Sequence, residues 1–215
     1  MTSLVTGIAA VVALDSLNYT LQNDIDRNAK ELLGADLVIN SDKKFNKQLE
    51  AAFDSLKLQQ ASEADMASMV LFLNNNQTRL IRLVALSGPF PFYGKIETLP
   101  ADAYQKLSEG KFAMLDETLA SQFEVSSGDS VRIGNVVFTV SGTVSKIPGG
   151  GGIMASFTPS VYIPMSELDS TRLVQFGSRV NYKRLFKVDS DNQLESTLNV
   201  LEPLIKKYGH SYETV

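Results

Sequence analysis

The chain has 215 residues, 44% of them hydrophobic, which is enough for one large domain or two small ones with real cores. The net charge of −4 and the pI near 5.1 exclude the strongly basic surface that nucleic-acid binding requires, so no nucleic acid is expected among the partners. Because the sequence contains no cysteine, disulfide bonds, thiol catalysis and zinc–thiolate sites are excluded together.

The N-terminal part of the sequence changes character halfway along. Residues 1–14 carry no charge and are almost wholly apolar. From Asp15 onward, apolar side chains recur at steps of three and four, with charged and polar side chains between them. The apolar face of this predicted helix includes Leu17, Leu21, Ile25 and Leu32. A helix that is apolar all round at one end and amphipathic at the other is typical of a chain that passes between two solvents.

The apolar run 1–14 is shorter than the roughly 20 residues that a membrane-spanning helix needs. A signal peptide is disfavoured, because no lysine or arginine precedes the run and no cleavage-type turn follows it. A buried core helix is one alternative. We interpret residues 1–34 instead as the end of a transmembrane helix that runs unbroken into a long helix. From Thr2 to Leu33 such a helix measures about 48 Å, more than a domain of this size usually needs.

Residues 35–87 predict the order β-α-β-β. The strand ADLVIN is followed by Ser41 and Asp42, which are favourable N-cap residues for the next helix. Two further apolar strands lie on either side of the turn sequence Asn74–Asn76 and are expected to form a hairpin.

Residues 180–215 predict the order β-α-β. Ser190 and Gln193 resemble a capping box at the start of the helix, and Gly209 is expected to end it. Neither terminal segment has enough strands to be stable alone. We therefore expect them to form one α+β unit, with its helices on one face of a mixed sheet.

The segment between them, residues 88–179, differs in composition and in the length of its predicted elements. It begins with a link rich in proline, glycine and aromatic residues, and continues with short helices and short strands, including a hairpin signal at Gly134–Asn135. The predicted fold class is therefore α+β. A discontinuous α/β unit from residues 35–87 and 180–215 is interrupted by a β-rich unit and preceded by a long N-terminal helix.

The sequence contains no convincing catalytic, cofactor or metal site. His210 is the only histidine and follows the last predicted helix, so a hydrolase would depend on it alone, without a G-x-S-x-G motif. The glycine run 149–152 lacks the following lysine of a phosphate-binding loop and is expected to be a loop between strands. Asp189 and Asp191 fit helix capping better than a calcium loop. We expect a non-enzymatic protein part.

Two apolar groups are candidates for contact with a partner. One is an aromatic cluster in the link, for which packing at the junction of the two units is the alternative. The other is the tip of the glycine-rich loop. The candidate residues are Phe90, Phe92, Tyr93, Ile153, Met154 and Phe157.

Four segments resemble, in order, parts of the FtsX-like ABC transporter permeases. The N-terminal segment resembles the end of their first membrane helix with its A-x-x-LLGADL-V motif: GIAAVVALDSLNYTLQNDIDRNAKELLGADLVI. The next two resemble the V-x-G-x-YPLYG and LA-x-x-L-x-V-x-x-GD-x-V motifs: VALSGPFPFYGKIET and LDETLASQFEVSSGDSVRIGNVVFTVSGTV. The last resembles the GSRV-x-Y motif: FGSRVNYKRLFKV. The likeness is greatest to the YbbP type, whose domain is a MacB-like periplasmic core.

The resemblance implies that the α/β unit is Porter-like and the β-rich unit Sabre-like. It also implies a permease in the inner membrane, with this domain on the periplasmic or extracellular side, a cytoplasmic ATPase subunit and a second permease copy. ATP hydrolysis would then be coupled to mechanotransmission or export that acts on a lipid, lipoprotein or protein partner. The alternative is a lipid- or solute-binding module without a transport role, which would need an apolar pocket of roughly 300 Å³ or more.

Overall fold

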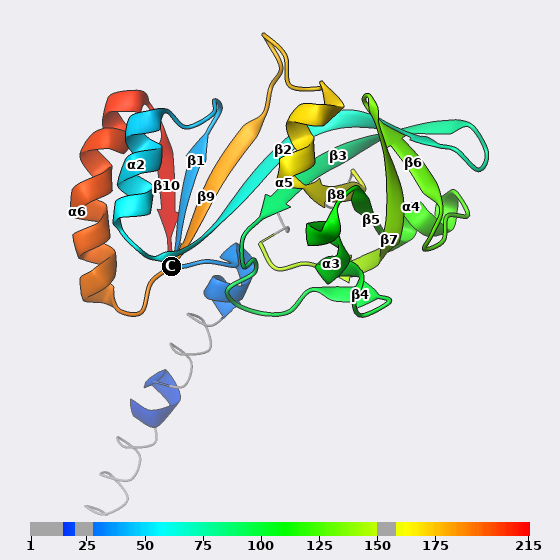
Figure 1. Ribbon diagram of the computed structural model, residues 1–215. Helices are drawn as coiled ribbons and strands as arrows, with labels where there is room; N and C mark the ends of the chain where they lie inside the picture. The colour runs from blue at the N-terminus through cyan, green and yellow to red at the C-terminus, as the bar shows by residue number, and fades with distance from the viewer. Residues whose placement is uncertain (1–14, 20–27, 150–157) are drawn as a thin grey trace, which may run out of the picture.

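The computed structural model describes residues 15–19, 28–149 and 158–215, and a mixed sheet of ten strands runs through this part of the chain (Figure 1). The strands are β1 (Leu37–Ser41), β2 (Gln59–Phe72), β3 (Gln77–Ser87), β4 (Glu97–Leu99), β5 (Phe112–Asp116), β6 (Ser130–Ile133), β7 (Val136–Lys146), β8 (Ser160–Pro164), β9 (Asn181–Lys187) and β10 (Ser211–Thr214). The α-helices that pack on the sheet are α2 (Lys47–Ser55), α3 (Ala103–Lys106), α4 (Glu117–Gln122), α5 (Met165–Leu168) and α6 (Asp191–Tyr208). The strands are mostly antiparallel, with parallel pairs β3–β8 and β5–β7, and the α+β class predicted from the sequence is confirmed.

The two ends of the chain share one half of the sheet, in the order β10-β1-β9-β2. Leu37 and Ile39 alternate with Val38 along β1, so they face one side of the sheet while Val38 faces the other. Helices α2 and α6 cover the side of Leu37 and Ile39, and Phe53 of α2 and Leu201 of α6 are fully buried there. The expectation that the helices cover one face is met in this half.

The start of α2 differs from the prediction made from the sequence. Asn46 is the N-cap, and its side-chain oxygen accepts a hydrogen bond of 2.9 Å from the Leu49 amide. Ser41, one of the predicted caps, is the last residue of β1 and pairs with Tyr182. Its hydroxyl forms hydrogen bonds with the backbone of Lys43. Ser41 therefore belongs to the strand and does not cap the helix.

The caps of α6 are those predicted. Ser190 accepts a hydrogen bond of 3.4 Å from the Gln193 amide, and the Gln193 side chain accepts one of 2.8 Å from the Asp189 amide. Gly209 ends the helix in the left-handed conformation, at φ 71°. Replacing Ser190 with alanine is expected to lower the free energy of unfolding by about 1 kcal/mol, measured by urea denaturation. Ser196→Ala on the exposed face of the same helix is the control and should change it by less than about 0.5 kcal/mol.

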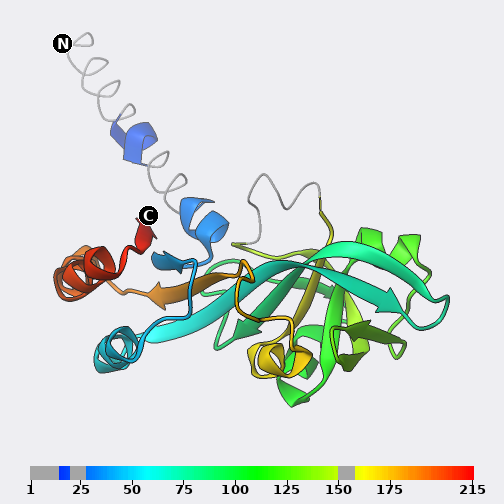
Figure 2. The ribbon, with the colours of Figure 1, turned by 90° about the horizontal axis from the view of Figure 1, so that it is seen from above.

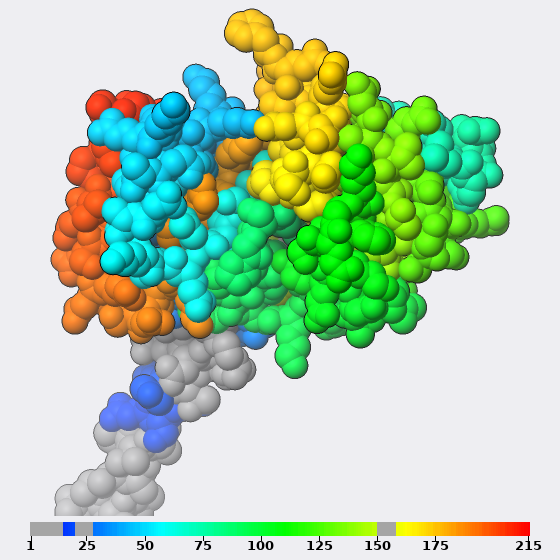
Figure 3. Space-filling model, in the orientation of Figure 1, coloured from blue at the N-terminus to red at the C-terminus, as the bar shows by residue number. Residues whose placement is uncertain are grey.

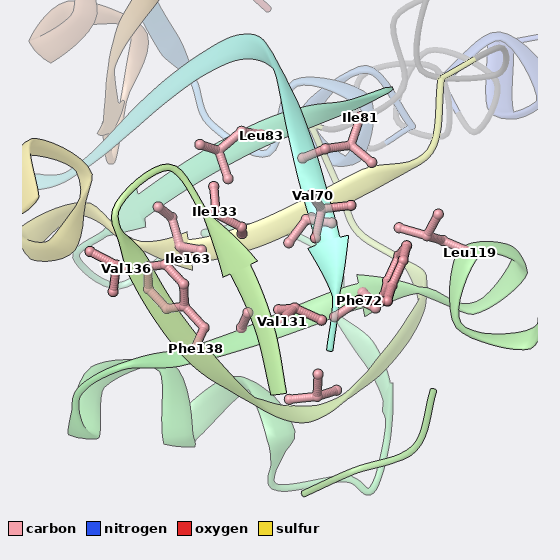
Figure 4. Close-up of a cluster of buried hydrophobic side chains, with 14 of the residues drawn as sticks. Val70, Phe72, Ile81, Leu83, Leu119, Val131, Ile133, Val136, Phe138 and Ile163 are labelled. Carbon is pink, nitrogen blue, oxygen red and sulfur yellow. The ribbon is translucent and has the colours of Figure 1, made fainter. Parts of the chain in front are cut away.

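The other half of the sheet closes on itself. β2 pairs with β3, β3 with β8, β8 with β5, β5 with β7, β7 with β6, and β6 again with β2. These six strands form a ring around a shared apolar interior (Figure 4). The labelled side chains that fill it are Val70, Phe72, Ile81, Leu83, Leu119, Val131, Ile133, Val136, Phe138 and Ile163. Burying each of the larger ones contributes about 1.5–3 kcal/mol, so the ring has a core of its own.

β2 belongs to both halves of the sheet. Its residues 59–65 pair with β9, and its residues 70–72 pair with β6. The sequence predicts this strand from about Ala64, rich in methionine, valine, leucine and phenylalanine, so the prediction begins five residues after the observed start of β2 at Gln59. The predicted division into one unit of residues 35–87 and 180–215 and a second unit of residues 88–179 stays a prediction. The β2–β3 hairpin contributes to both halves of the sheet.

The described parts of the N-terminal segment are helical at residues 15–19 and 28–33. Residues 15–19 stand clear of the body, whereas residues 28–33 lie against its base near the start of β1 (Figure 2). Of the helices in the described ranges, none has the length and hydrophobicity that a membrane crossing requires. The predicted membrane helix end at residues 1–14 lies outside the described residues.

The predicted apolar face of the N-terminal helix is only partly described. Leu17 is 55% exposed and Leu32 is 70% exposed. Neither side chain is therefore buried by the body of this chain. Leu21 and Ile25 lie outside the described residues, so the face as a whole stays a prediction.

Candidate functional site

The N-terminal helix joins the sheet at Gly34. The Gly34 amide donates to the Lys30 carbonyl at 2.8 Å, and the Gly34 carbonyl accepts from the Phe92 amide at 3.0 Å. Gly34 has φ +70°, and a side chain there would come within 3.0 Å of the Phe90 ring. The chain therefore needs glycine at the point where the helix turns into β1.

Gly34→Ala is expected to lower the free energy of unfolding by about 1–3 kcal/mol, since it adds backbone strain and a contact with Phe90. Gly209→Ala is a matched control, because Gly209 has nearly the same φ of +71° but no atom within 4 Å of the added side chain. The difference between the two losses, measured by urea denaturation, isolates the contact with Phe90. Equal losses would contradict this account.

Asp36 holds the helix, the link and the end of β9 together. Asp36 is only 4% exposed. One carboxylate oxygen lies 2.9 Å from the Lys30 Nζ. The other accepts a hydrogen bond of 2.7 Å from the Tyr93 hydroxyl and one of 2.8 Å from the Val188 amide. Charge-assisted hydrogen bonds of this kind are about twice as strong as neutral ones.

The backbone of Asp36 adds two further connections. Its amide donates to the Phe186 carbonyl at 3.1 Å, and its carbonyl accepts from the Val215 amide at 3.3 Å. One residue thus connects the N-terminal helix, the aromatic link, β9 and the end of the described chain. We call Lys30, Gly34, Asp36, Tyr93 and Val188 the coupling junction.

The electrostatics of the junction keep the Tyr93 hydroxyl a donor. Burial raises the pKa of Tyr93, and its hydrogen bond to the Asp36 carboxylate raises that pKa further. The Lys30 Nζ lies 5.4 Å from the centre of the Tyr93 ring, close enough for a cation–π interaction. Cation, ring and carboxylate support one another, so the arrangement suits a rigid joint.

The aromatic cluster predicted as a partner surface lies mostly at this junction. Phe90 is only 4% exposed and packs in the core beneath the sheet, so the prediction that it contacts a partner is wrong. Its carbonyl accepts a hydrogen bond of 2.6 Å from the Tyr104 hydroxyl. Phe92 and Tyr93 are half-buried, and Tyr93 is occupied by Asp36. The predicted contacts Ile153, Met154 and Phe157 lie outside the described residues.

Neither Asp36 nor Lys30 was predicted from the sequence. The available signal was a lone carboxylate, Asp36, two residues after Gly34 and directly before the apolar strand β1. Lys30 lies six residues earlier on the polar side of the helical pattern, and Tyr93 is far away in sequence. Only the fold brings the three together.

A second buried charge cluster connects β9, β2 and β3. The Glu63 carboxylate, 5% exposed, lies 3.0 Å from the Arg82 guanidinium and 3.1 Å from the Lys183 Nζ. Asp65 lies 3.2 Å from the same guanidinium. Burial lowers the pKa of Arg82, but the hydrogen bond to Asp65 and the two carboxylate charges outweigh this and raise it. We call Glu63, Asp65, Arg82 and Lys183 the seam cluster, because it lies where the two halves of the sheet meet.

His210 does not lie in a hydrolase-like arrangement. Its ring packs edge-on against Phe45 at 5.6 Å between centres, and its Nδ1 is buried without a hydrogen-bond partner among the described residues. Burial lowers the pKa of His210. Within the described residues there is also no group of three or more side chains placed to hold a metal ion.

Several surface cavities between described residues exceed the roughly 300 Å³ that a small ligand needs, and two of them are larger than 700 Å³. One of about 740 Å³ is lined by residues 42–44 and 174–182, and one of about 720 Å³ lies beside the coupling junction. Both cavities are open to solvent, and lysine side chains contribute to both linings.

Comparison with known proteins finds relatives over most of the chain. The uncharacterized ABC transporter permease YbbP of Escherichia coli K12 is 22% identical over 204 residues, which are 95% of this chain and 25% of YbbP. The chain thus spans about a quarter of the length of that relative.

Solved structures share the fold. The extracellular domain of the noncanonical ABC-type transporter YknZ from Gram-positive bacteria gives a TM-score of 0.51 at 15% identity, over 83% of this chain and 99% of that chain. The periplasmic region of MacB from Actinobacillus actinomycetemcomitans gives 0.52 at 14% identity, over 86% and 91%.

A family model assigns the chain more directly than any single relative. The model for the MacB-like periplasmic core domain matches residues 1–204, which include every strand of the sheet except β10. The resemblance seen in the sequence motifs points the same way. The chain belongs to the MacB-like periplasmic core domain family.

Proposed function

We propose that the chain is the extracytoplasmic domain of an ABC transporter permease of the inner membrane, and that it transmits motion from the membrane to a partner outside it. A cytoplasmic ATPase subunit drives the motion, and two permease copies act together. The work is done on a lipid, lipoprotein or protein outside the membrane. The domain itself is a mechanical part, and catalysis belongs to the ATPase.

The observation that carries this proposal is the coupling junction. Helix 28–33 is attached to β1 by Gly34 and by the Lys30–Asp36 contact of 2.9 Å. β1 lies between β10 and β9, so a force on the helix reaches the middle of that half of the sheet. A stiff helix with a braced joint moves its domain as a rigid body, which is one of the established ways of transmitting a conformational change.

Family membership supports the same proposal. The relatives named above are an ABC transporter permease and parts of ABC-type transporters. The family description, which is that of a periplasmic core, supports a place for the domain outside the cytoplasm.

Because residues 1–215 contain no cysteine, spin labels can be placed on two introduced cysteines in this domain, with any cysteine elsewhere in the full-length protein replaced by serine. Tyr19→Cys, in the exposed helix, and Val200→Cys, on the exposed face of α6, report the angle between helix and domain. We expect the distribution of distances between these labels, in the full-length protein in nanodiscs, to be narrow and unchanged by ATP. Asp36→Ala should broaden this distribution, whereas Asp102→Ala should not.

Two results would separate the parts of the proposal. A distance that shifts with ATP while Asp36 is intact would show bending between residue 19 and the sheet and would exclude a rigid lever. Failure of the full-length protein to co-purify with an ATPase subunit would exclude the permease assignment, whatever the label distances show.

A further inference from the structure

Phe176 is the most exposed large apolar side chain in the described part of the chain, at 108%. It lies in the segment 172–180 between α5 and β9. This segment projects from the body at the end opposite to the N-terminal helix, as the gold protrusion at the top of Figure 3 shows. Single exposed apolar side chains are common on protein surfaces, so the turn that holds Phe176 and the charges around it, and not the exposure alone, indicate a binding partner.

The segment presents Phe176 on a well-braced turn. The Ser178 amide donates to the Gln175 carbonyl at 3.0 Å, and Gly177 has φ +90°, as the third residue of a type II turn requires. The Ser178 hydroxyl accepts from the Gln175 amide at 3.0 Å and donates to the Leu173 carbonyl at 2.9 Å. Because the turn is already ordered, little conformational entropy is lost when a partner binds.

The cavity of about 740 Å³ lies directly beside this turn and has a basic rim. Lys44 is paired with Asp169 at 2.8 Å. None of the ion pairs between described residues involves Lys43 or Arg179, and both are exposed. Together they outweigh Asp42, the acidic residue in the lining. A chain with a net charge of −4 thus concentrates unpaired positive charge around its most exposed aromatic side chain.

We propose that the Phe176 turn and this basic rim form the docking surface for a soluble protein, which offers an apolar pocket for Phe176 and carboxylates for Lys43 and Arg179. Aromatic and arginine side chains are the usual anchors of protein interfaces. A symmetric contact with a second copy would place the two basic rims against each other, at an electrostatic cost. The proposed function is used only to place the partner, since the turn points away from the helix and so away from the membrane.

The test uses the photo-crosslinking amino acid p-benzoylphenylalanine, which keeps an aromatic ring, at position 176 of the full-length protein in the cells that make it. The matched position is Leu99, which is 76% exposed on β4. Irradiation should give a discrete protein adduct at position 176 and not at position 99. Mass spectrometry of the cross-linked peptide should find an acidic segment of another protein.

Reversing the charge of Arg179 or Lys43 tests whether the basic rim contributes to the contact. Arg179→Glu or Lys43→Glu should lower the adduct yield about tenfold, because like charges then face each other across the interface. Lys111→Glu, an exposed lysine in the other half of the sheet, should leave it unchanged. The docking surface is excluded by lipid adducts, by adducts with a second copy, by equal labelling at 176 and 99, or by a yield insensitive to Arg179→Glu and Lys43→Glu. A positive result without ATPase co-purification would keep the docking surface and exclude only the permease role.

Discussion

Glu63→Ala is expected to lower the free energy of unfolding by about 3–5 kcal/mol, the usual effect of breaking a buried ion pair by removing one partner. The substitution leaves the Arg82 guanidinium with Asp65 alone and the Lys183 ammonium without its carboxylate, where β9, β2 and β3 meet. Their side chains are only 18% and 24% exposed, so water compensates them poorly. Urea denaturation measures the loss, and the melting temperature should fall by about 10 °C.

The matched control for this prediction is Glu202→Ala. Glu202 pairs with Lys206 on the surface of α6, and an exposed pair one helical turn apart contributes about 0.3–0.5 kcal/mol. A double substitution of Glu63 and Arg82 by leucine and methionine should recover part of the stability, because apolar side chains of similar volume can replace a buried pair. A loss no larger than that of Glu202→Ala would show that the seam cluster does not stabilise the sheet.

Asp36→Ala is expected to lower the free energy of unfolding by about 2–4 kcal/mol. The Tyr93 hydroxyl and the Val188 amide each lose their acceptor, and a donor left unpaired in a buried place costs about 1–3 kcal/mol. Lys30 contributes less, because its side chain is 37% exposed and can be hydrated. Tyr93→Phe removes a single hydrogen bond and should cost about 0.5–1.5 kcal/mol.

The location of the damage distinguishes Asp36 from an ordinary stabilising residue. Hydrogen exchange of the amides in residues 28–33 should accelerate in Asp36→Ala, while the ring of strands around Phe138 stays protected. Asp102→Ala is the control, since Asp102 makes only an exposed pair with Lys106. Uniform acceleration across the chain would mean that Asp36 supports the whole fold and has no special role at the joint.

Local signals account for most of what could be predicted. The caps of α6, the hairpin around Asn74–Asn76 and the turn at Gly134–Asn135 depend on neighbours within a few residues, and all three are found. The start of α2 was misplaced because Ser41 pairs with β9, which is distant in the sequence. Residues close to Ser41 in the sequence give no sign of this pairing. The polar start of β2 was missed for the same reason, since its pairing with β9 overrides its low strand propensity.

The candidate sites show the same limit. The exposed Phe176 and the buried Phe90 are both phenylalanines near glycine and proline or polar neighbours, and nothing in the local pattern separates them. Asp36, Lys30 and Tyr93 each have an ordinary sequence context. Their joint role depends on contacts across 57 residues, from Asp36 to Tyr93, and across 152, from Asp36 to Val188.

The sequence by itself determined the order of the elements, the α+β class and the resemblance to the permease family, because periodicity, caps and motifs are written locally along the chain. The tertiary structure alone decided that β6 closes a ring against β2, that β2 connects both halves of the sheet, and that a buried carboxylate braces the N-terminal helix. The physical reason is that strand pairing and buried charge compensation join residues far apart in sequence, and their energies exist only once the chain has folded.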